Sequence, residues 1–194
     1  DCKNFRGRVT GQSGDITLEA DRGTIALDKA GHVNADNNLT LMAATGANGK
    51  VTVTGNSAAT SSVNAKKMTI NAGQVAISNI NLTATDSNSI TGGKVSIANS
   101  YLSANGGDLK INATATDRAT QAMTVTGTNI LTARGGDIRI TAASADGVNG
   151  GAIVMSGDTT LNADHSYISG TSTYNNTGAK ISGNLVASGD LDIT

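Results

Sequence analysis

A five-residue unit, in which glycine is followed by apolar residues at the third and fifth positions, recurs along this chain of 194 residues. The copies cover residues 14–18, 23–27, 49–53, 93–97, 107–111, 136–140, 151–155 and 189–193. Alternation with a period of two places both apolar side chains on one face of a short strand. The unit therefore predicts a chain of short β-strands, each with one buried face.

A longer repeat contains this unit and continues with an apolar residue, a spacer and alanine. The clearest copies cover residues 75–84, 95–104, 123–133 and 153–163. A third alternating pair follows, as at Leu109 and Ile111, although only one aliphatic residue is visible near Ile90 and near Ile168. We therefore expect three short strands in each repeat.

The repeats start at Val75, Val95, Met123 and Ile153, so their period is loose while the order of the strands is kept. This pattern is typical of a solenoid with insertions, in which each strand pairs with its equivalent in the next turn about 4.8 Å away. Parallel crossovers are right-handed in nearly all proteins. The prediction is an all-β, right-handed parallel β-helix with three-stranded coils, about seven coils in all.

The composition indicates how such coils bury a core. Hydrophobic residues make up 38% of the chain, but there are only one Phe, three Tyr and no Trp. A core with so few aromatic rings is built from small aliphatic layers. We expect Ile97, Leu109, Val125, Ile138 and Ile153 to point inward in stacked ladders.

Charge and hydropathy exclude several classes of partner. The formal net charge is -1, and basic residues are scattered apart from Lys66 and Lys67, which leaves no electrostatic footprint for nucleic acid. No apolar run approaches the roughly 20 residues of a membrane-spanning helix, so we expect no membrane insertion. The single Cys2 cannot form an internal disulfide. Because the chain starts at Asp1 without a signal peptide, we expect residues 1–194 to be one β-helix segment of a much larger protein.

The Gly-Asp-Ile-x-Ile and Leu-x-Ala units, the Asn-, Ser- and Thr-rich turns and the absence of Pro resemble the repeat regions of two-partner-secreted exoproteins. Filamentous haemagglutinin and the high-molecular-weight adhesins are members of this family, and the resemblance covers residues 9–194. The family's amino-terminal secretion domain carries an Asn-Pro-Asn signature, which this chain lacks. The resemblance therefore implies the repeat shaft of a secreted, surface-displayed adhesin, whose full-length form would need an outer-membrane secretion partner.

Catalytic, metal and cofactor sites are not expected. Asp15, Asp108, Asp137 and Asp190 each follow a turn glycine, where a short carboxylate can accept hydrogen bonds from turn amides, and they form no catalytic pair. The double glycines do not recur with the nine-residue period of calcium-binding repeats. His32 has no second histidine or cysteine at metal-ligand spacing, and neither does the second histidine of the chain.

Insertions between strands are the places where a solenoid usually carries recognition. The longest departures from the repeat are residues 54–62, 85–92, 114–121, 143–150 and 164–178. The last one holds His165, Tyr167 and Tyr174, and tyrosine suits contact with carbohydrate or protein. These three residues are the predicted binding residues.

We weigh three functions, of which the resemblance implies the first two. The first is a structural and adhesive shaft, secreted or displayed on a bacterial surface, that attaches to a receptor or glycan on host cells or other bacteria. The second is the stalk of a contact-dependent growth-inhibition toxin, which the chain does not separate from the first. The third is a carbohydrate-active β-helix enzyme, which would need a cluster of acids across adjacent coils. We expect no enzyme.

Overall fold

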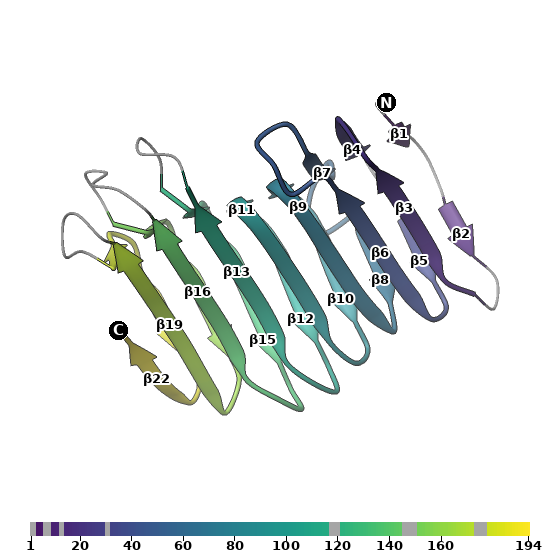
Figure 1. The fold of residues 1–194 in the computed structure, drawn as a ribbon. Coiled ribbons are helices and arrows are strands. Elements are labelled where there is room, and N and C mark those ends of the chain that lie inside the picture. Colours follow the sequence, from purple (N-terminus) through teal and green to yellow (C-terminus); the bar gives the residue numbers. More distant parts are fainter. Residues whose placement is uncertain are drawn as a thin grey trace.

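The computed structural model describes residues 3–5, 9–11, 14–29, 32–116, 121–144, 151–172 and 178–194, with side chains described from residue 14 onward. In these ranges the chain forms only β-strands, and the strand pairs are parallel. The strands stack as a β-solenoid of about six turns, close to the seven predicted (Figure 1). The predicted parallel β-helix is therefore confirmed.

One of the two sheets, here called sheet B, contains eight strands that each pair with the equivalent strand of the next turn. Most of them contain the apolar residue, spacer and alanine of the longer repeat, as in the Leu-x-Ala units of β10, β12 and β15. Sheet B consists of β2 (Val9–Gly11), β5 (His32–Ala35), β8 (Ser62–Ala65), β10 (Asn81–Ala84), β12 (Tyr101–Ala104), β15 (Asn129–Ala133), β18 (Thr159–Asn162) and β21 (Leu185–Ala187).

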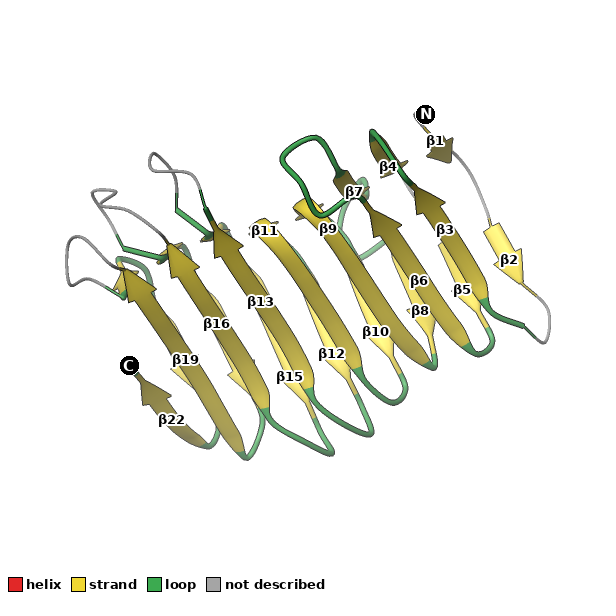
Figure 2. Ribbon diagram, in the orientation of Figure 1, coloured by secondary structure: helices red, strands yellow, loops and turns green. Residues whose placement is uncertain are grey.

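The other sheet, sheet A, divides into two limbs that share the long strands β9 (Lys67–Ser78) and β11 (Asn88–Ala98). Limb A1 adds β1 (Lys3–Phe5), β4 (Thr24–Leu27), β7 (Lys50–Thr54), β14 (Met123–Thr126), β17 (Ile153–Ser156) and β20 (Ala179–Ile181). Limb A2 adds β3 (Ile16–Ala20), β6 (Asn38–Ala43), β13 (Leu109–Ala115), β16 (Ile138–Ser144), β19 (His165–Ser172) and β22 (Asp190–Ile193). Figure 2 shows these strands side by side along the rod.

The register of the pairs shows how the turns differ in length. Val75 pairs with Val95, which pairs with Met123, and Met123 pairs with Ile153, so successive turns take 20, 28 and 30 residues. These are the spacings that the sequence predicts. The last repeat is shifted by two residues, because Ile153 pairs with Ala179 and Ile181 pairs with Met155.

The core is one continuous stack of inward side chains from Ala20 to Ile168. The five positions predicted to point inward are all buried, at 1% exposure or less. Burial alternates along each strand, as in β16, where Ile138 and Ile140 are buried and Arg139 is exposed. At about 25 cal/mol per Å² of apolar area, these ladders supply most of the favourable free energy of folding.

Two inward positions hold polar residues where the sequence shows no second aliphatic residue. Asn88 occupies the place of Met68 and Leu109 in the neighbouring turns, and Ser166 occupies the place of Ile138. Both side chains are buried, and their polar atoms have no hydrogen-bond partner in the described part of the chain. The third strand is therefore present near Ile90 and Ile168, although the hydrophobic pattern there is broken.

Small residues allow the chain to turn its corners. The alanines that end strands of sheet B are buried, as with Ala84, Ala104 and Ala133, so a larger side chain there would crowd the core. The turn from limb A1 into sheet B requires a left-handed residue, which is Asn99 in one turn and Gly127 in the next. A Cβ on Gly127 would also lie 2.1 Å from the Asn99 side-chain oxygen, so both backbone conformation and space favour glycine there.

Two predicted insertions are wrong in part. Residues 85–92 contain only a short turn before β11 begins at Asn88. Most of residues 164–178 form β19, which pairs with β16 and β22. In both places a buried polar residue occupies an inward strand position, so the sequence pattern there is the same as that of a loop. No helix in the described ranges is long and apolar enough to span a membrane.

Candidate functional site

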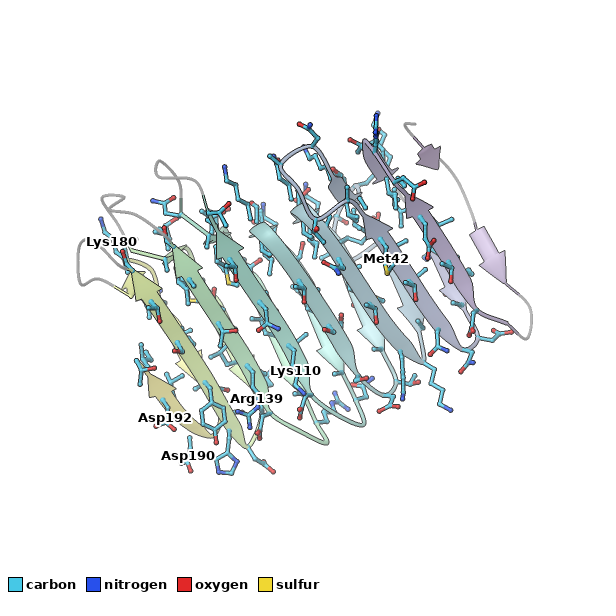
Figure 3. The ribbon with its side chains drawn as sticks, in the orientation of Figure 1. Met42, Lys110, Arg139, Lys180, Asp190 and Asp192 are labelled. Carbon is cyan, nitrogen blue, oxygen red and sulfur yellow. The ribbon has the colours of Figure 1, made fainter. Side chains whose placement is uncertain are left out.

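Charged and aromatic side chains gather where limb A2 begins, on four consecutive turns. We call this group the charged strip. Figure 3 shows Lys110, Arg139, Asp192 and Asp190 along the lower ends of β13, β16 and β22. The charged strip consists of Asp108, Lys110, Asp137, Arg139, His165, Tyr167 and Asp190. The strip arises from a spacing that recurs at each turn from sheet B into limb A2. A polar residue precedes the first inward side chain of the limb, and a second outward residue follows that inward side chain, as with Asp137, Ile138 and Arg139.

The Asp108 carboxylate joins two successive turns of the solenoid. It accepts a hydrogen bond from the backbone N–H of Asp137 at 3.0 Å and forms an ion pair with Lys110 at 2.9 Å. The amide hydrogen bond, followed by the hydrogen bond and charge of Lys110, lowers the pKa of Asp108. Asp15 acts in the same way, since its carboxylate accepts a bond from the Asn38 amide at 3.1 Å. For these two residues the predicted turn chemistry is confirmed, and the amide belongs to the following turn.

Arg139 is held by two partners on the strip. Its guanidinium donates a hydrogen bond to the Asp137 carboxylate at 2.6 Å and lies 4.5 Å from the centre of the Tyr167 ring. Arg139 and Tyr167 are opposite each other in the parallel register of β16 and β19, which brings the cation over the ring. A cation above an aromatic face is attracted by the negative potential of the ring.

His165 stands between two carboxylates. Its Nδ1 is 3.8 Å from Asp137, its Nε2 is 3.5 Å from Asp190, and its ring stacks on Tyr167 with 6.5 Å between centroids. His165 and Tyr167 were predicted to lie in a loop insertion. That placement is wrong, because both belong to β19 and face outward from a paired strand. Tyr174 lies outside the described residues, so its predicted role stays a prediction.

The charged strip is satisfied by its own members. Lys110 faces Asp108, Arg139 faces Asp137 and Tyr167, and His165 faces two carboxylates. A ligand would have to displace these contacts before it could use the same groups. The arrangement therefore favours a role in holding turns together over a role in recognition, and binding by His165 and Tyr167 stays a prediction.

The strip also offers no arrangement typical of a metal centre. Among the described residues, no group of three or more His, Cys, Asp or Glu is placed to hold a metal ion. His32, the other histidine, lies within hydrogen-bond distance of the Ser62 hydroxyl, at 2.8 Å. Each carboxylate of the strip faces a cation, a histidine or a backbone amide.

A second polar and aromatic surface lies on sheet B, which is behind limb A2 in Figure 1. A hollow of about 300 Å³ crosses β10, β12 and β15, and we call it the sheet B hollow. Its outward residues include Tyr101, Ser103, Asn105, Ile130, Thr132 and Arg134. This surface is not visible in the sequence, because Tyr101 and Arg134 are 33 residues apart and only the register of β12 and β15 brings them to the same face.

Comparison of this chain with models of protein families, with curated proteins and with solved structures finds no match.

Proposed function

We propose that this chain is part of the rigid adhesive shaft of a bacterial protein that is secreted or displayed on the cell surface. The observation that carries the proposal is the uninterrupted parallel stack, in which one aliphatic core runs through the turns and outward columns of small polar residues cover the faces. Such a stack is stiff because every turn is hydrogen-bonded to the next. A stiff rod with exposed polar faces is suited to presenting contact surfaces at a distance.

The resemblance of the Gly-Asp-Ile-x-Ile and Leu-x-Ala units to two-partner-secreted exoproteins supports the same proposal. In that setting an outer-membrane partner exports the full-length chain, which then attaches to a receptor or glycan on host or bacterial cells. The fold itself is compatible with export in an extended state, because the strands pair turn by turn.

An adhesion assay tests the proposal. Beads coated with the folded chain should adhere to epithelial or bacterial cells more than beads coated with a parallel β-helix whose outward residues have been replaced by alanine and serine. Circular dichroism and urea denaturation establish that both coats are folded. Equal adherence of the two coats would contradict an adhesive function and favour the alternative, the stalk of a contact-dependent growth-inhibition toxin.

The same beads also test the predicted binding residues. If the predicted binding residues make the contact, Tyr167→Ala and Tyr174→Ala should each reduce adherence while urea denaturation shows both variants folded. Unchanged adherence would remove these residues from the contact.

Release of reducing ends from polysaccharide, measured with the same folded chain, would overturn the expectation that the chain is no enzyme.

A further inference from the structure

We propose that the sheet B hollow binds a short stretch of acidic polysaccharide, with a pyranose ring on Tyr101 and a carboxylate on Arg134. The inference deepens the proposed adhesive function by naming a ligand class and a site. It rests on that function only for its biological role, because sugar binding by the hollow can be measured without cells.

The geometry of the hollow is set by the register of two neighbouring strands. Tyr101 on β12 is opposite Ile130 on β15, and Arg134 lies four residues beyond Ile130. At roughly 3.3 Å per residue of extended chain, Arg134, which directly follows β15, lies about 13 Å along the chain from the position opposite Tyr101. The distance exceeds one sugar ring, so the ligand is an oligosaccharide that lies along the strand direction.

The floor between these two residues is suited to hydroxyl groups. Ser103 and Thr132 are opposite each other and face outward between Tyr101 and Arg134. Asn105 is exposed beside Arg134 and adds an amide that can both donate and accept. Ile130 extends the apolar surface next to the Tyr101 ring, which is 38% exposed.

Within the described part of the chain, the residues that line the hollow form no ion pair, in contrast with those of the charged strip. Among the described residues, none forms an ion pair with Arg134 or a hydrogen bond with the Tyr101 hydroxyl, and no carboxylate lines the hollow. An exposed arginine without a carboxylate partner can take a planar carboxylate from a ligand through two parallel hydrogen bonds. An exposed aromatic ring provides the apolar platform for the C–H face of a pyranose.

Uronic acids and sialic acids both supply a pyranose ring with a carboxylate. Binding is measured by calorimetry on the folded chain with four probes in two pairs: oligogalacturonate with its methyl-esterified form, and sialyllactose with lactose. We expect the carboxylated member of at least one pair to bind at least tenfold more tightly than its neutral counterpart. The pair that shows the difference identifies the source of the carboxylate. No preference for either acidic probe would overturn the inference.

Variants locate the site. Tyr101→Ala should weaken binding at least tenfold and Tyr101→Phe by less than threefold, because the ring is kept. Arg134→Gln should abolish the preference for the acidic probe. Lys180→Gln, which removes an exposed positive charge on limb A1, is the matched control and should bind like the parent.

Three results would overturn the inference: unchanged binding by Tyr101→Ala, an acid preference that survives in Arg134→Gln, or a loss in Lys180→Gln equal to that in Arg134→Gln. Tyr167→Ala adds an independent arm, since a selective loss of binding there would place the site on the charged strip. If sugar binding is found but coated beads do not adhere to cells, the inference stands and the adhesive function fails. If beads adhere to cells but the chain shows no preference for either acidic probe, the adhesive function stands and the inference fails.

Discussion

The two faces of this solenoid each carry a tyrosine and an arginine on neighbouring turns, and the two pairs are arranged differently. On limb A2, Arg139 is opposite Tyr167 and lies 4.5 Å from the ring centre, with the Asp137 carboxylate as a second partner. On sheet B, Arg134 is four residues beyond the position opposite Tyr101, no carboxylate lines the hollow, and Arg134 forms no ion pair with a residue of the described ranges.

The register of the strands determines whether such groups stabilise the fold or stay available to a ligand. Residues opposite each other on parallel strands are close enough to satisfy one another, whereas a displacement of four residues separates them by about 13 Å. Asp137 and Arg139 are two residues apart on one outward face, which lets the Asp137 carboxylate bind Arg139 as well. The predictions below test this difference, and the first concerns the core that both faces share.

Val125→Asp should have the largest effect, because it places an unpaired carboxylate between Ile97 and Met155 in a position that is 1% exposed. The expected loss is about 4 kcal/mol in the free energy of unfolding. Urea denaturation measures this loss. The control is Thr126→Asp, an exposed position on the same strand. Equal midpoints for both variants would contradict the assignment of inward positions.

Thr132→Asp should give Arg134 a carboxylate partner, as Asp137 gives one to Arg139. It places a carboxylate two residues before Arg134 on the same outward face, which is the spacing of Asp137 and Arg139. We expect binding of the acidic probe to weaken at least tenfold, about 1.4 kcal/mol, while the urea midpoint changes little. Thr132→Asn keeps the size without the charge and should bind like the parent. If the aspartate variant also binds like the parent, Arg134 does not hold the carboxylate.

Asp108→Asn should reduce the free energy of unfolding by about 1 kcal/mol in neutral solution. The expected value is at the low end for a charge-assisted hydrogen bond, because 33% of the Asp108 side chain is exposed. The pKa of Asp108 is lowered by the Asp137 amide and by Lys110, so the stabilisation is present above the ordinary aspartate pKa of about 3.9 and is lost as the pH falls through the lower folded value. Urea denaturation at neutral and acid pH measures the difference. A difference that persists in strong acid would rule out the carboxylate as its cause.

Arg139→Gln should have the smallest effect, about 0.5 kcal/mol, because its ion pair and its contact with Tyr167 are both partly exposed. High salt should reduce the difference from the parent through screening. Arg134→Gln is the matched control and should leave the urea midpoint unchanged at any salt concentration. A larger loss from Arg134→Gln than from Arg139→Gln would reverse the comparison.

The sequence predicts the fold well because the alternating apolar pairs are inward positions, and inward positions define a solenoid. It does not predict the strands at Asn88 and Ser166, since a polar side chain in the core has the same pattern as a loop. It predicts the turn aspartates but not their partners, which lie one turn away across coils of 20 to 30 residues. The right-handed sense of the coil stays a prediction.

The most direct test of the difference between the two faces is a nuclear magnetic resonance titration of the isotope-labelled chain with the acidic oligosaccharide that calorimetry identifies. The account predicts shifts in the backbone signals of β12 and β15, centred on Tyr101 and Arg134, and unchanged signals for Arg139 and Tyr167 on limb A2. Shifts confined to β16 and β19, with β12 and β15 unchanged, would contradict it.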